Sequence, residues 1–483
     1  MLINLFVLPL FIKNLGAELY GIWILSGVVL GYAGVFDFGF TQGLQKYVAE
    51  ARVKKDDQEL SEVVVTGLGI LTILGVCIGA VIYWGAPAIV GFFNIEAEQA
   101  EVALQLLRIS ALFSVVMWPL RIVDVVLNAS MQIKELSLLN GFKSIIQSIV
   151  MLVMIVYSFE IIQIKWVVAS LVFAVALYGI ALLKKYAPEV CWDFEHFKFH
   201  QISRMQGFSL GIFYAGVIGL FSVQIDTLII GRFLSMSAVT AYVIAAKPFH
   251  LIQQVGGLLM RVVTPASYTL GAQKDVARLS RLVTVGVRVR SLTVIPICFV
   301  AFICVPDFIL LWVGNNYSNE IIWAQAFLLV PILACLGVGA HVCKGVGGIA
   351  LINNFSTAKI ALNLVISIIL LPHFGVGGPI LGTILSNLLL GDCAAFWAYC
   401  RYIGVSSRAG YGFFFQVLFV SLVAYIITYL GFRMWMGEGG TYSSLFLKAT
   451  LAVVVQSIAH VLFCLTKTEK GVVVLRVKQM LVL

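Results

Sequence analysis

The chain has 483 residues, of which 61% are hydrophobic and 11% are charged, and its formal net charge is +9. Soluble proteins average about 45–50% apolar and about 25% charged residues, so this composition excludes a soluble globular domain. Apolar stretches of about 20 residues recur along the whole length and predict an all-α, polytopic membrane protein. We attribute the positive charge to loops between spans, not to nucleic acid binding.

The first apolar segment, Met1–Ile12, is shorter than the roughly 20 residues that a crossing needs. It carries no basic region and no cleavage site, so we expect a short first helix and not a signal peptide. Further apolar segments bring the expected number of spans to about fourteen. They lie near residues 19–40, 63–86, 102–127, 137–158, 162–183, 207–230, 238–262, 288–312, 321–343, 357–373, 378–400, 411–431 and 443–465.

Basic residues gather on one side of the membrane when the N-terminus is placed in the cytoplasm and the spans alternate. On this side the loops hold 21 of the 32 basic residues. The opposite loops hold only 4, namely Lys13, Lys165, Arg232 and Arg433. This bias follows the positive-inside rule and predicts that both termini are cytoplasmic.

Two similar stretches indicate an internal repeat. One span starts near Tyr20 and ends before the basic loop Arg52–Lys55, and another starts near Tyr242 and ends before Lys274–Arg281. Six helices separate them, and an even number favours parallel repeats. The predicted organisation is a six-helix lobe over 1–183, a cytoplasmic interfacial linker over 184–205, a second six-helix lobe over 206–402, and two extra helices with a basic cytoplasmic tail over 403–483.

Short motifs carry a family resemblance. The stretches Leu15–Trp23 and Asp37–Phe40, and later Asp226–Leu234, resemble the two opening signatures of polysaccharide and O-antigen (Wzx-like) flippases. This family is the polysaccharide transporter branch of the multidrug/oligosaccharidyl-lipid/polysaccharide (MOP) exporter superfamily. A further stretch resembles the late helix pair of this family, through Asn363, Phe374–Pro379 and Gly382.

The resemblance implies two six-helix lobes around a central cavity in a bacterial inner membrane. It implies transport of undecaprenyl-pyrophosphate-linked oligosaccharide units by alternating access, in surface polysaccharide biosynthesis. The expected partners are the lipid-linked oligosaccharide, membrane lipids, and assembly proteins such as a polysaccharide polymerase. We expect no cofactor, no metal and no catalytic residue.

Lys247 is the leading candidate for binding the pyrophosphate of such a cargo. It lies about ten residues into its span, directly before Pro248. A cation at that depth costs roughly 3 kcal/mol, so we expect it to face a cavity or a partner. The alternative is a structural ion pair with Asp226. His250 shares its helix face, where it could sense pH or bind sugar, although a buried, hydrogen-bonded histidine is the simpler interpretation.

Three further cations are candidates for the same role. Arg121 follows Pro119 in the inner part of its span, and an ion pair with Asp124 on the same helix face is the alternative. Lys143 and Arg108 lie nearer the ends of their spans and could instead extend to the interface.

Acidic residues within spans could bind a proton or Na⁺ and couple transport to a gradient. The candidates are Asp226, Asp392 and Asp124, each of which could instead pair with a nearby cation. We expect Asp37 to cap a helix end or to lie at the interface.

Two other functions stay open. A cation-coupled drug antiporter of the same superfamily would favour acids and aromatic residues in its cavity. A membrane polysaccharide polymerase or glycosyltransferase would place catalytic residues in large outer loops, which are short here. An inactive or scaffold member is a third alternative.

Residues 184–204 mix basic and aromatic residues and predict a helix lying on the inner leaflet.

Overall fold

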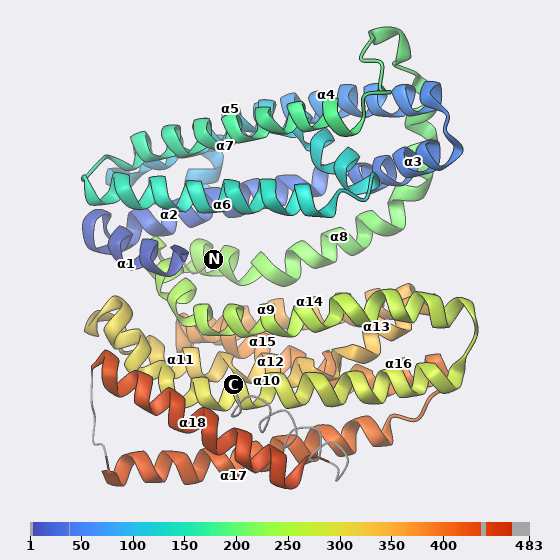
Figure 1. The fold of residues 1–483 in the computed structure, drawn as a ribbon. Helices are drawn as coiled ribbons and strands as arrows, with labels where there is room; N and C mark the ends of the chain where they lie inside the picture. Colours follow the sequence, from blue (N-terminus) through green and yellow to red (C-terminus); the bar gives the residue numbers. More distant parts are fainter. Residues whose placement is uncertain (1–2, 38, 436–440, 466–483) are drawn as a thin grey trace, which may run out of the picture. The chain divides into compact units, whose positions relative to one another are not determined.

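The computed structural model describes residues 3–37, 39–435 and 441–465 (Figure 1). In this part of the chain the secondary structure is helical and contains no strand, which confirms the all-α fold class. The chain divides into two compact units, Met1–Thr240 and Ala241–Leu483. The linker that we predicted over 184–205 lies inside the first of these units, and most of the predicted basic tail lies outside the described residues.

The first unit is an assembly of long helices that lie alongside one another (Figure 1). Its elements are α1 Ile3–Leu15, α2 Ala17–Ala33, η1 Gly34–Asp37, α3 Phe40–Lys54, α4 Asp57–Phe92, α5 Ala97–Ala129, α6 Ile133–Val156, α7 Ile161–Tyr186, η2 Phe194–His196 and α8 Phe199–Phe233. The next helix, α9 (Met236–Ala272), begins at the end of this unit and continues into the second.

The second unit combines long helices with one segment that is broken into short pieces. Its elements are α10 Val276–Val313, η3 Asn315–Tyr317, α11 Glu320–Phe327, α12 Leu329–Leu333, η4 Ala334–Gly337, α13 Val338–Gly345, α14 Ile349–Phe374, α15 Gly377–Leu390, α16 Asp392–Ile403, α17 Arg408–Trp435 and α18 Tyr442–Phe463.

Ten helical segments in the described residues are long and apolar enough to cross a membrane, and an eleventh is added if the two parts of α8 count as one span. The protein is therefore a multi-pass membrane protein, while the total of about fourteen spans stays a prediction. Helix α1 has 13 residues, which gives a length of about 20 Å. As described, it is too short to cross a core of about 30 Å, as expected for the first segment.

Helix starts follow from capping residues in the polar loops. At the start of α4 the Asp56 side chain accepts a hydrogen bond of 2.8 Å from the Glu59 backbone N–H. At the start of α10, Asp275 accepts one of 2.9 Å from the Arg278 N–H. Each carboxylate satisfies a backbone donor that has no partner within its helix.

The core of the first unit lies between α3, α4 and α5. Leu44, Val63, Leu71 and Leu127 are among its fully buried side chains. Gly67 lets α3 and α4 approach closely, because a Cβ at this position would lie only 2.5 Å from a methyl carbon of Leu44. Small residues at such contacts allow membrane helices to gain packing energy.

The late family motif corresponds to the tightly packed pair α14 and α15. The Ser367 hydroxyl donates to Asn363 Oδ1 at 2.7 Å, and Asn363 Nδ2 donates to the Thr383 hydroxyl at 3.2 Å. Gly382 lies against this cluster, where a Cβ would come within 2.8 Å of Asn363 Oδ1. The motif thus encodes a polar contact between two membrane helices. Only glycine at position 382 leaves room for this contact.

We predict that one added methyl group has opposite effects at two glycines of the second unit. Gly382→Ala should destabilise the protein by about 1–3 kcal/mol through overpacking. Gly431→Ala, in α17, meets nothing within 4 Å and should be neutral or stabilising by up to about 1 kcal/mol. Thermal unfolding of the detergent-purified variants measures both, and equal melting temperatures would contradict this packing.

Candidate functional site

A polar cavity of about 480 Å³ opens inside the first unit. We call it the polar cavity. Its charged lining residues are Asp37 from η1 and Arg121 and Asp124 from α5. Further polar groups come from Thr41, Gln42, Gln45 and Asn128, and the α8 side of the wall includes Phe213, Gly216, Val217 and Leu220. The volume lies within the range of about 300–1,000 Å³ that is usual for small-molecule sites.

The turn between α2 and α3 places Asp37 at this cavity. Gly39 has φ of 73°, a left-handed conformation that favours glycine, and directly precedes α3. The Asp37 carboxylate is buried and accepts a hydrogen bond of 3.1 Å from the Thr41 backbone N–H. This bond fits the capping role that we expected, but the same carboxylate also lines the cavity, which the sequence did not indicate.

Arg121 is the cation of the polar cavity. Its guanidinium lies over the ring of Trp118, one turn earlier on α5, at 4.1 Å from the ring centroid. Among the described residues no carboxylate oxygen lies within ion-pair distance of it, although Asp37 and Asp124 both act on its charge. The ion pair with Asp124, which was the alternative to a binding role, is therefore not formed, and N–H donors of Arg121 stay available to a ligand.

Arg121 also lines a second cavity of the first unit, of about 410 Å³. We call it the aromatic cavity, because Trp23, Phe113 and Trp118 form part of its wall. Lys165 of α7 lines it as well, and its ammonium donates to the Ser26 hydroxyl at 3.2 Å. The sequence analysis assigned Lys165 to an outer loop, which was wrong, since the residue lies within helix α7.

The other two cations that we predicted as binding residues in the first unit do not line either cavity. Lys143 of α6 is half-buried and donates a long hydrogen bond of 3.5 Å to Asn140, with its charge acting on Asp124. Arg108 of α5 is half-buried with its guanidinium 5.4 Å from the Tyr83 ring centroid. Their roles in substrate binding stay predictions.

Lys247 and His250 lie one turn apart on α9, in the second unit, and both are half-buried. Neither lines the two cavities described above. Asp226, which we considered as a partner for Lys247, is buried on α8 and belongs to the first unit. The binding role of Lys247 and the coupling role of Asp226 therefore stay predictions.

Asp392 begins α16 and lies close to Arg290 of α10. A Cβ at Gly337 would be 2.5 Å from Asp392 Oδ2 and 3.1 Å from Arg290 Nη1, so the two charges meet at the broken segment around η4. Arg290 lies within helix α10. Pairing with a nearby cation was the alternative that we gave for Asp392, and this neighbourhood favours it.

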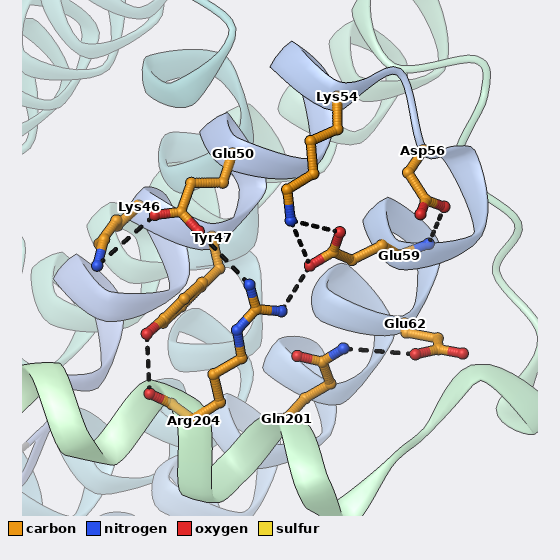
Figure 2. A network of polar contacts seen from close by, with 9 residues as sticks. All are labelled: Lys46, Tyr47, Glu50, Lys54, Asp56, Glu59, Glu62, Gln201 and Arg204. Atoms are coloured by element: carbon orange, nitrogen blue, oxygen red, sulfur yellow. Dashed lines mark hydrogen bonds and ion pairs between the residues drawn. The ribbon is translucent and has the colours of Figure 1, made fainter.

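The segment from 187 to 204 is fastened to α3 and α4. It contains only the short turn η2 before α8 begins, and not the single helix that we expected. Figure 2 shows Arg204 reaching from α8 to Glu50 and Glu59, whose oxygens lie 3.5 and 2.5 Å from its guanidinium nitrogens. The Tyr47 hydroxyl donates to the Arg204 carbonyl at 3.0 Å. These contacts hold the start of α8, which then continues to the polar cavity.

No group of three His, Cys, Asp or Glu side chains in the described ranges could hold a metal ion.

Two solved structures of membrane transporters have a similar fold. The lipid II flippase MurJ, in an inward closed conformation, is similar with a TM-score of 0.76 at 14% identity over 96% of each chain. A multidrug resistance MATE family transporter, in an inward-facing conformation, gives a TM-score of 0.72 at 14% identity over 83% of this chain and 94% of its own. The chain thus shares its fold with these two transporters.

Sequence comparison defines the family more closely. The family described as "Polysaccharide biosynthesis protein" matches residues 15–322, which is more than half of the chain. The chain belongs to this family. A Shigella flexneri protein named as a candidate O-antigen transporter is 23% identical over 312 residues, covering 63% of this chain and 71% of that protein. The relatives are named as transporters or flippases and not as enzymes.

We predict that Thr66 protects an amide of the 187–204 segment from exchange. Its hydroxyl accepts a hydrogen bond of 2.9 Å from the Lys198 N–H. Thr66→Val should speed hydrogen exchange at Lys198 about fivefold, the equivalent of about 1 kcal/mol. Thr72→Val is the control, because Thr72 donates only to the Leu68 carbonyl of its own helix. Unchanged exchange at Lys198 would show that this contact does not hold the segment.

Proposed function

We propose that the protein is a flippase for lipid-linked oligosaccharide units, used in the biosynthesis of a surface polysaccharide. The observation that carries the proposal is the polar cavity inside the membrane-spanning first unit of a member of the polysaccharide biosynthesis family. Charged groups within a membrane protein usually face a cavity and mark a substrate pathway.

The cavity suits the polar part of such a cargo. Its carboxylates, amides and hydroxyl can hydrogen-bond to sugar hydroxyls, while the guanidinium of Arg121 can bind a phosphate or carboxylate through two parallel N–H bonds. The polyprenyl tail can stay in the surrounding lipid. The cavity therefore needs to shield only the glycan and its anionic groups.

The cycle that we propose is alternating access, in which the cavity opens to one face of the membrane and then to the other. The N- and C-termini lie in the cytoplasm, and the membrane is a bacterial inner membrane. The positive-inside bias of the loops and the family membership support this placement. Lys247, Lys143 and Arg108 are proposed as further cations on the pathway, and polysaccharide assembly proteins as partners.

A cation-coupled antiporter is the second candidate. The polar cavity has two carboxylates, Asp37 and Asp124, for its single guanidinium, a balance that also suits a cationic substrate. The similarity to a MATE family transporter is in keeping with this alternative at the level of the fold.

Complementation tests the proposed function. The chain is expressed in strains that lack their own oligosaccharide flippase, and surface polysaccharide is read on gels at matched membrane levels. We expect rescue by the parent chain. Absence of rescue in several sugar systems, together with export of a cationic dye, would reject the flippase in favour of the antiporter.

The same assay tests the site. Arg121→Met should reduce rescue about tenfold or more, because it removes the cation of the cavity, and Arg121→Lys should retain part of it. Arg278→Met is the control, since Arg278 is exposed at the start of α10 and pairs only with Asp275 in its own turn. Equal rescue by Arg121→Met and the control would remove Arg121 from the site while leaving the function in place.

A further inference from the structure

The aromatic cavity contains two cations and no acid. Among its described lining residues Arg121 and Lys165 are positively charged, and none is Asp or Glu. The polar cavity differs, because there Arg121 faces two carboxylates. A cation inside a membrane protein is costly unless it is compensated, so the aromatic cavity is suited to an anion.

Neither cation of this cavity forms an ion pair within the described part of the chain. The Lys165 ammonium contacts the Ser26 hydroxyl at 3.2 Å and lies 4.8 Å from the Trp23 ring centroid. The Arg121 guanidinium lies on the Trp118 ring. Both charges rest on aromatic faces, which attract cations but accept no proper hydrogen bond. An ammonium has three donors and a guanidinium five, so most of their donors are free for a ligand.

The remaining lining fits a sugar ring. Trp23 and Phe113 are half-buried in the wall and offer aromatic surface against which the C–H side of a pyranose can stack, whereas Trp118 is buried beneath Arg121. Ser110 and Ser114 donate to carbonyls of their own helix, at 2.8 and 2.7 Å, so their oxygens can still accept from sugar hydroxyls. Along α5 the lining runs from Ser110 to Arg121, about 16 Å at about 1.5 Å per residue.

We propose that the aromatic cavity binds a carboxylate-bearing sugar, such as a hexuronic acid residue of the transported glycan. The ring stacks on the aromatic wall formed by Trp23 and Phe113, and the carboxylate lies between Lys165 and Arg121. A planar carboxylate matches the two-pronged geometry of arginine, and lysine adds a point charge. This inference rests on the proposed function, which it extends to a preference for acidic repeat units.

Binding of a soluble disaccharide tests the site directly. The full chain is placed in nanodiscs of zwitterionic lipid, and ligand-observed NMR gives the dissociation constants. The probes are a glucuronic-acid-containing disaccharide, its neutral methyl ester, and pyrophosphate. We expect the acid to bind about tenfold more tightly than the ester, and pyrophosphate not to compete more strongly than the acid.

Variants assign the preference to Lys165. Lys165→Met should abolish the difference between acid and ester, while Lys165→Arg should keep it. Trp23→Leu should weaken both sugars alike and preserve their ratio, because stacking does not depend on the charge. Lys13→Met is the matched control, since Lys13 is an exposed lysine at the end of α1. It should behave as the parent chain does.

Several results would overturn the proposal. The first is equal binding of acid and ester to the parent chain, a result that does not depend on whether Lys165→Met folds. The second is a folded Lys165→Met that still prefers the acid. Stronger binding of pyrophosphate would assign the cavity to the cargo's headgroup. Displacement of the acid by anionic lipid added to the nanodisc would assign it to membrane lipid.

The binding test of this site and the complementation test of the proposed function can fail independently, because equilibrium binding does not depend on transport. A preference for the acid in a chain that rescues no flippase strain would leave the site standing and reject the function. Rescue of neutral and acidic systems with equal efficiency, together with no preference in binding, would reject the site alone.

Discussion

The cost of placing charge within a membrane is the constraint on which the structure of the first unit depends. Arg121 is half-buried on a membrane helix, and two cavities meet at its side chain. The Trp118 ring supports the guanidinium from one side, and the carboxylates of Asp37 and Asp124 act on it from the polar cavity. This arrangement keeps the charge in place without neutralising it in a close ion pair. An anionic ligand can therefore replace solvent at Arg121 without first breaking a salt bridge.

A buried ion pair of the second unit shows a different arrangement of charge. Lys448 of α18 pairs with Asp307 of α10 at 2.7 Å, and both side chains are buried. A buried pair of this kind satisfies both charges and leaves nothing for a ligand. This pair joins two helices, whereas Arg121 and Lys165 of the first unit line cavities and form no ion pair among the described residues. The contrast supports placing the candidate site in the first unit.

The sequence predicted the class of fold because hydropathy and the positive-inside bias are properties of long segments. It also predicted Arg121 and Asp124 as site residues, and the structure places both on the wall of one cavity. Lys165 was expected in an outer loop because it lies only three residues into the predicted span 162–183, and hydropathy defines span ends only to within a few residues; it lies within helix α7. Asp37 was expected only to cap a helix end or to lie at the interface, since no local pattern reveals that such a carboxylate also faces a cavity formed by helices that are distant in sequence.

Translocation in proteoliposomes measures the central claim most directly. The purified chain is reconstituted with a lipid-linked oligosaccharide, and glycan that is initially protected inside the vesicles is followed as it becomes accessible to an added glycosidase. The account predicts that protected glycan becomes accessible in vesicles with the chain and stays protected in vesicles without protein. Equal protection in both, for acidic and neutral glycans alike and with an imposed ion gradient, would contradict it.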